Sequence, residues 1–92
     1  MAEDEAWREF VGQVVVVDTD SHFVHIGTLR EVRDHFLVLA EVDAHDTRQS
    51  TSTKEQYIMD TKRFGVKANR RETAVRKSMI VSVSKLDDVV LY

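Results

Sequence analysis

Two short strand-forming segments, separated by a long polar stretch, constrain the fold of this chain most strongly. The first segment, residues 26–39, begins inside a strand expected over residues 22–32, in which apolar side chains lie on both faces around Gly27. A glycine inside a strand marks a bend, a bulge or a close backbone approach. A sharply bent second strand is what a small five-stranded barrel requires. The later segment, residues 75–83, is expected to supply a closing strand.

The other expected elements follow from local signals along the chain. The amino-terminal half predicts a short helix over residues 3–10 that Gly12 ends, followed by strands over 14–17, 22–32 and 36–42. The carboxy-terminal half predicts a polar loop over 43–53, a helix over 54–64, a strand over 66–68, a turn over 69–71, and strands over 73–83 and 89–91.

The helix expected over residues 54–64 has recognisable signals at both ends. Ser52 and Glu55 form a Ser-x-x-Glu capping box, in which each side chain bonds the backbone amide of the other residue. Gly65 is placed to stop the helix. The sequence therefore predicts that a helix is inserted between strands of the barrel.

Length and composition indicate one domain spanning residues 1–92. The chain has no cysteine, which excludes disulfides and thiolate metal sites. Its first residues are acidic, unlike a signal peptide, and no apolar run is long enough to span a membrane. We therefore expect a cytoplasmic protein with no membrane association.

The charge of this chain is unevenly distributed. The net charge is −3, yet seven basic residues and one acid give residues 62–77 a charge of +6. A basic segment of this kind forms either a solvated surface that maintains solubility or a surface that attracts nucleic acid. Composition leaves both interpretations open.

Two motifs in this chain resemble those of the Sm-like (LSm) family. The family's first motif is Gly-x-Leu-x-x-x-Asp-x-x-Met-Asn-x-x-Leu, and the residues that match it are Gly27, Leu29, Val32 and the strand 37–39. The second is Ile-Arg-Gly-x-x-Val-x-x-Ile, and the residues that match it are Val75, Arg76, Ile80 and Val83. The chain resembles a divergent, bacterial-type member of the family, with a longer segment at 43–74.

The resemblance implies a mainly β fold. This is the Sm-like (SH3-like) five-stranded, strongly bent antiparallel barrel, here with an amino-terminal helix and an inserted helix near residues 54–64. The resemblance also implies a binding module that forms a ring, is not an enzyme and needs no cofactor.

The resemblance implies an RNA site between two loops. In RNA-binding members, a stacking side chain and an Asn come from the loop after the second strand, and the Arg of the second motif packs on the base. His35 and Arg76 carry over as the stacking pair. Arg33 occupies roughly the family's Asp position, Asp34 is the only stand-in for the Asn, and Lys77 replaces a Gly.

Without that Asn, we expect single-stranded RNA to bind with little sequence preference. Arg70 and Arg71, in the basic window, are expected to contribute by charge.

Other kinds of site find less support in the sequence. Asp43, His45 and Asp46 offer oxygen and nitrogen ligands for a divalent metal, but their spacing matches no established site, so we expect none. The chain has no Gly-rich phosphate loop and no nucleophile in a recognisable turn, which argues against an enzyme.

Unpaired strand edges at 75–83 and 89–91 predict a homo-oligomeric ring of about five to seven subunits. Two functions then compete. The first is a ring that binds single-stranded RNA. The second is a structural or protein-interaction ring without RNA binding, which docks a protein partner through the inserted helix.

Overall fold

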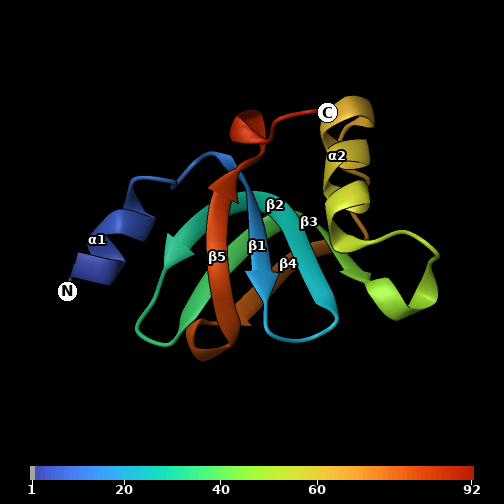
Figure 1. Cartoon of the computed structure of the whole chain (residues 1–92). Coiled ribbons are helices and arrows are strands. Elements are labelled where there is room, and N and C mark those ends of the chain that lie inside the picture. The colour runs from blue at the N-terminus through green and yellow to red at the C-terminus, as the bar shows by residue number, and fades with distance from the viewer. Residues whose placement is uncertain (1) are drawn as a thin grey trace.

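One antiparallel sheet, bent around an apolar core, forms the body of the protein in the computed structural model, which describes residues 2–92 (Figure 1). The strand order in the sheet is β4-β3-β2-β1-β5. The helices and strands are α1 (Ala2–Arg8), β1 (Val14–Thr19), β2 (Phe23–Val32), β3 (Phe36–Asp46), α2 (Lys54–Phe64), β4 (Arg70–Arg76) and β5 (Ile80–Lys85). The prediction of a mainly β, five-stranded bent antiparallel fold with two helices is confirmed.

The backbones of β2 and β3 approach each other closely at Gly27. A Cβ atom at Gly27 would lie 3.0 Å from the carbonyl oxygen of Ala40 and 3.1 Å from the Cα of Val42. The pairing of β2 with β3 shifts register at this point, and Glu41 of β3 has a positive φ of 50°. Gly27 therefore permits the close backbone approach that the sequence predicts.

The bent sheet buries apolar residues on both of its faces. The inner core, inside the curl, consists of residues from β1 to β4: Val15, Val17, Leu29, Leu37, Leu39, Val42 and Val75. The outer cluster, on the other face, consists of Val16, Val24 and Ile26 of the sheet together with Ile58 of α2. This arrangement explains the Val14–Val17 run, because β1 is covered on both faces.

Helix α2 begins and ends where the sequence predicts, but its cap is a different residue. Thr53, not Ser52, is the N-cap: it has extended backbone angles, and its hydroxyl accepts a hydrogen bond from the amide of Gln56 at 3.1 Å. Ser52 lies one residue too early to reach that amide. The reciprocal Ser52–Glu55 box is therefore wrong, while Gly65 ends the helix as expected.

The strand expected over residues 73–83 is interrupted. A 3₁₀ turn, Lys77–Met79, separates β4 from β5. The interruption is necessary because β4 pairs only with β3 and β5 only with β1, so the chain crosses between opposite edges of the sheet. The turn predicted over 69–71 is also wrong, since β4 already begins at Arg70.

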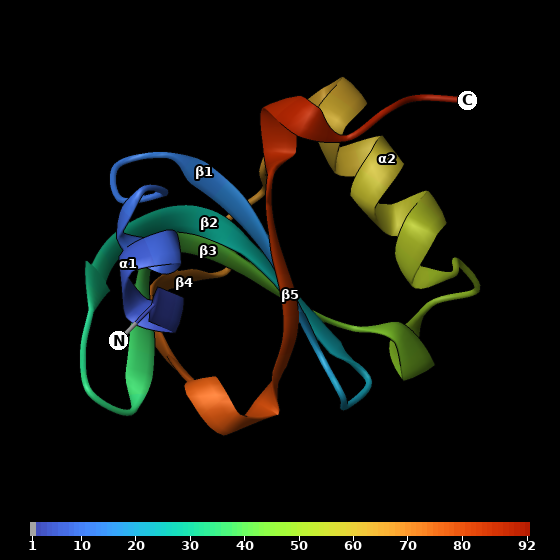
Figure 2. The ribbon, with the colours of Figure 1, turned by 60° about the vertical axis from the view of Figure 1, so that its left-hand side comes forward.

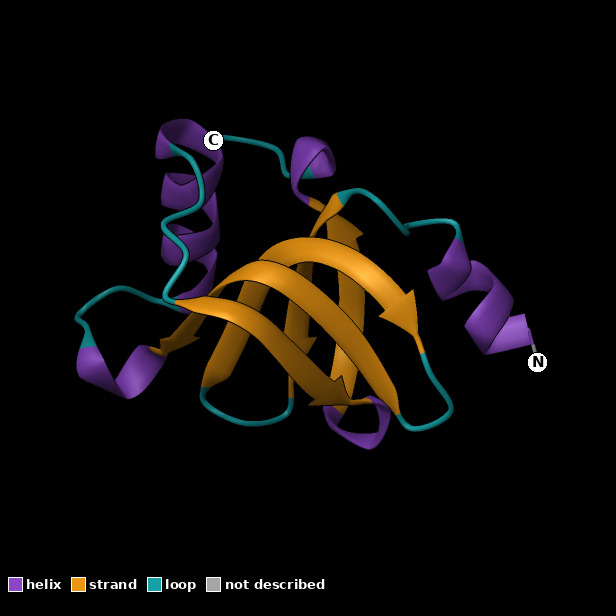
Figure 3. Cartoon of the chain, turned by 180° about the vertical axis from the view of Figure 1, so that it is seen from behind, coloured by secondary structure: helices purple, strands orange, loops and turns teal. Residues whose placement is uncertain are grey.

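Several predicted boundaries differ from the structure. Residues 66–68 and 89–91 are not strands, because neither segment finds a strand to pair with. Strand β3 continues to Asp46 and so takes in the first part of the expected loop, while α1 ends at Arg8, two residues early. Figure 3 shows the sheet from behind, with α1 and α2 at opposite ends of it.

The two open edges of the sheet are β4 and β5, each of which pairs with a single strand among the described residues. The edge predicted over 75–83 is therefore two separate edges, and the one predicted over 89–91 is absent. Within residues 2–92, neither helix has the length and apolar character needed to cross a membrane.

Candidate nucleic-acid interface

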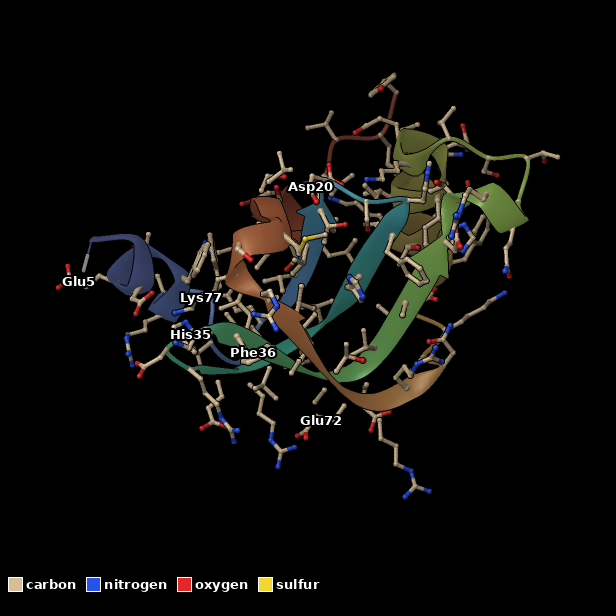
Figure 4. All side chains as sticks on the ribbon, turned by 90° about the horizontal axis from the view of Figure 1, so that it is seen from below. Glu5, Asp20, His35, Phe36, Glu72 and Lys77 are labelled. Carbon is tan, nitrogen blue, oxygen red and sulfur yellow. The ribbon has the colours of Figure 1, made fainter. Side chains whose placement is uncertain are left out.

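The β2–β3 connection and the β4–β5 turn lie against each other at one end of the sheet. The backbone amide of Lys77 donates to the carbonyl oxygen of His35 at 2.9 Å, and the amide of Arg33 donates to the carbonyl of Phe36 at 2.9 Å, closing the connection tightly. Figure 4 shows His35, Phe36 and Lys77 together at this end. The two predicted halves of the site are thus adjacent.

Arg76 stacks on an aromatic ring beside His35. Phe36 lies opposite Arg76 in the β3–β4 register, and the guanidinium carbon of Arg76 is 5.3 Å from the centre of the Phe36 ring. His35 and Arg76 are exposed, and Phe36 is half-buried. A planar cation over an aromatic ring, with an exposed histidine as the preceding residue of the chain, can stack on a flat, unpaired base.

Sequence reasoning missed Phe36 as a site residue. Phe36 alternates with Val38 and Ala40, a pattern that is typical of one face of a strand and does not indicate a binding site. The missing information was the strand register, which places Phe36 directly beside Arg76.

Lys77 contributes its backbone to this corner but directs its side chain elsewhere. Its ammonium lies 2.7 Å from a carboxylate oxygen of Asp4 and 5.5 Å from the centre of the Trp7 ring, both in α1. The side chain of Lys77 is only 11% exposed. The hydrogen bond from Lys77 lowers the pKa of Asp4, so the charge of Lys77 is already compensated by α1.

Arg33 and Asp34 lie in the β2–β3 connection, and both are exposed. The guanidinium of Arg33 donates to Glu31 at 3.1 Å, which lowers the pKa of Glu31 and raises that of Arg33. This pair is solvated on both sides, so it contributes little to stability. Arg33 can therefore exchange Glu31 for a phosphate at low cost.

Arg70 and Arg71 lie at the opposite end of β4 from Arg76. Six residues of extended chain separate Arg70 from Arg76, a distance of about 20 Å at roughly 3.3 Å per residue. The predicted site residues therefore divide into two groups. The first group lies at the end of the sheet where the loop of His35 meets Arg76. The second group, Arg70 and Arg71, lies at the opposite end of β4.

The Asp and His residues considered for a metal site are engaged with protein groups. Asp43 is 8% exposed and accepts a hydrogen bond from the Tyr57 hydroxyl, and burial raises its pKa. His45 stacks on Tyr57 with ring centres 3.7 Å apart. Arg48 donates to Asp46 and holds the pKa of that carboxyl at about 2. Within residues 2–92, no group of three or more such side chains is arranged to hold a metal ion.

Comparisons with known proteins identify the fold. No protein-family model matches the sequence, and no curated protein is similar to it in sequence. Among solved structures, the chain is similar to an Sm protein of Pyrococcus abyssii, solved in complex with a uridine heptamer, with a TM-score of 0.60 and 15% sequence identity. The match covers 88% of this chain and 93% of that one. The bent five-stranded sheet with its amino-terminal helix is therefore an Sm-like fold.

Proposed function

We propose that this chain is a divergent member of the Sm-like family that forms a ring and binds single-stranded RNA with low sequence preference. The observation that carries the proposal is the guanidinium of Arg76 over the ring of Phe36, the residue that follows the exposed His35. A similar fold in an Sm protein solved with a uridine heptamer supports it.

In this proposal, a base enters the corner between the rings and the guanidinium of Arg76. Stacking tolerates any base, because every base has a π-face. Asp34, which the resemblance offers in place of the family's Asn, is the side chain we propose to accept a hydrogen bond from a base edge, and a carboxylate accepts only from amino or imino groups. Arg33 would contact the adjoining phosphate.

The two open edges support the proposed ring. Strand β4 of one copy can pair with β5 of the next, and a head-to-tail contact of this kind closes when its fixed rotation completes a circle. Pairing would satisfy backbone groups that the isolated chain leaves to water. About five to seven subunits is the size we propose.

The test is fluorescence anisotropy with labelled uridine-rich and adenine-rich ten-mers. Arg76→Ala and His35→Ala should each weaken binding by about 1–3 kcal/mol through lost stacking and charge. The matched control is Arg63→Ala, which removes the same charge from an exposed position on α2. We expect the control to change affinity much less than Arg76→Ala, and all three variants to assemble as the parent does.

Absence of binding by intact rings at low salt would contradict the RNA proposal. Equal losses in Arg63→Ala and Arg76→Ala would indicate nonspecific attraction alone. A strong preference for one oligomer would identify Asp34 as a reader of the base edge, which Asp34→Ala should then abolish.

A protein-interaction ring is the second candidate, and one side chain favours it. Phe64, at the end of α2, is 74% exposed, whereas Tyr57 is half-buried in its stack with His45. An exposed phenyl ring at a helix end is a typical protein contact. If the rings form but do not bind RNA, the protein-interaction function remains as the explanation.

A further inference from the structure

A small pocket lies between α2 and the end of β3. Figure 2 shows α2 standing beside the sheet, on the side away from α1. The pocket has a volume of about 150 Å³. Asp43 of β3 lines it, as does Lys67 from the segment that follows α2. Four further lining residues have the spacing of a single helix face: Tyr57, Asp60, Thr61 and Phe64.

Two aromatic rings form part of the pocket lining. Tyr57 is held in place, because His45 stacks on its ring and its hydroxyl donates to the carboxylate of Asp43. Phe64, the last residue of α2, is largely exposed. The face of an aromatic ring attracts a cation, and the attraction strengthens when water is excluded. The lining can therefore bind a positively charged group.

Two carboxylates line the same pocket. Asp43 is buried and accepts hydrogen bonds from neutral groups, the hydroxyl of Tyr57 and the side-chain amide of Asn69 at 3.4 Å. Asp60 accepts one from the side-chain amide of Gln56 at 2.9 Å. Within residues 2–92, neither carboxylate forms an ion pair. Burial raises the pKa of Asp43, so a cation beside it would offset the desolvation of its charge.

The size and chemistry of the pocket fit the end of one basic side chain. Pockets for drug-sized ligands have volumes of roughly 300–1,000 Å³, so this pocket is too small for a nucleotide, and its carboxylates repel phosphate. A guanidinium is planar, so it can stack on Phe64 while its N–H groups donate to Asp60. It is also less strongly hydrated than an ammonium. Arginine therefore suits the pocket better than lysine.

Lys67 opposes the binding of a second cation. Its side chain is exposed and, among residues 2–92, forms no ion pair, so it can turn toward solvent. The lining keeps a negative charge, because two carboxylates outweigh one ammonium. Removing Lys67 should consequently strengthen the binding of a cation, whereas removing a carboxylate should weaken it.

We propose that the pocket between α2 and β3 binds an arginine side chain of another protein, with the guanidinium over the Phe64 ring and hydrogen-bonded to Asp60. The inference deepens the protein-interaction function, on which it rests, by naming the chemistry of the partner. It depends on neither the RNA site nor ring closure.

The test is a titration of the isotope-labelled protein with the peptide Gly-Gly-Arg-Gly-Gly, followed by amide chemical shifts. We expect the shift changes to concentrate at residues 57–67. Two matched peptides carry citrulline or lysine in place of arginine. The citrulline peptide keeps the shape of arginine without its charge and should not bind. The lysine peptide should bind more weakly than the arginine peptide.

Variants of the protein locate the site. Asp60→Asn and Phe64→Ala should each weaken binding of the arginine peptide by about fivefold or more. Lys67→Ala should strengthen it by about two- to threefold. Glu55→Gln is the matched control, because it removes the charge of an exposed acid on the same helix, outside the pocket, and should bind as the parent does. Circular dichroism checks that each variant is folded.

Three results would overturn the inference. They are the absence of shift changes at residues 57–67 in excess arginine peptide, equal binding of the citrulline peptide, and equal losses in Asp60→Asn and Glu55→Gln. The last would mean diffuse attraction to an acidic protein. Equal binding of the lysine peptide would overturn the choice of arginine.

The RNA ten-mers separate this inference from the RNA proposal. Asp60→Asn and Phe64→Ala should bind the ten-mers as the parent does. A parent protein that binds the arginine peptide but not the ten-mers would support this inference and contradict the RNA proposal. The reverse result would contradict this inference and leave the RNA proposal in place.

Discussion

The two faces of the bent sheet are covered in different ways. The buried residues of the inner core all come from strands, with Trp7 and Phe10 of the amino-terminal segment packed against them, and six of the seven are fully inaccessible to solvent. The outer cluster depends on one helix from an inserted segment, and Ile58 of that helix keeps 9% of its surface exposed. The inner core therefore rests mainly on strand residues, whereas the outer cluster rests on a helix that lies between β3 and β4 in the chain.

The largest stability effect should come from the inner core. Leu39→Ala removes a fully buried side chain from strands that have little room to collapse, so we expect a loss of about 3–5 kcal/mol in the free energy of unfolding. Urea unfolding followed by circular dichroism measures it. A loss below about 2 kcal/mol would mean that the core relaxes, and the contrast between the two faces would fail.

The outer face should tolerate the same kind of truncation better. Ile58→Ala leaves space that opens onto a groove beside β5, where water or neighbouring side chains can enter. We expect a loss of about 2 kcal/mol, at the low end for an isoleucine truncation. The same urea titration reports it. A loss equal to that of Leu39→Ala would show that α2 is as much a part of the core as the strands.

The smallest effect concerns the cap of α2. Thr53→Ala should cost about 1 kcal/mol, because the amide of Gln56 loses its acceptor. Ser52→Ala is the matched control and should change stability very little, since Thr53 and not Ser52 caps the helix. Chemical shifts of residues 54–57 would locate the loss at the first turn. Equal effects of the two changes would contradict this assignment of the cap.

The sequence predicted features that depend on neighbours along the chain. The bend at Gly27, the double covering of β1 and the limits of α2 all follow from local spacing, turn residues and alternation. The break at Lys77–Met79 could not be predicted, because it arises from the separation of β4 and β5 to opposite edges of the sheet.

At the candidate site, too, the sequence could not predict the contacts that the folded arrangement creates. The resemblance proposed His35 and Arg76 as site residues, but it could not predict the Phe36 ring beneath Arg76 or the Asp4 carboxylate that pairs with Lys77. Asp4 lies 73 positions before Lys77 in the chain, a contact that only the folded packing creates. Residues 66–68 and 89–91 have strand-forming composition but no edge to join in the isolated chain.

The unlike chemistry of the two open edges gives the subunit a direction. Strand β4 carries three arginines, so two β4 strands side by side would bring like charges together, whereas β5 presents mainly Val and Ser. In the proposed ring, copies would therefore join front to back. A partial arc built in this way always has one unused edge of each kind, and Val81 of the unused β5 stays 66% exposed. Only closure removes both ends, so a complete circle should be the species that resists further growth and aggregation.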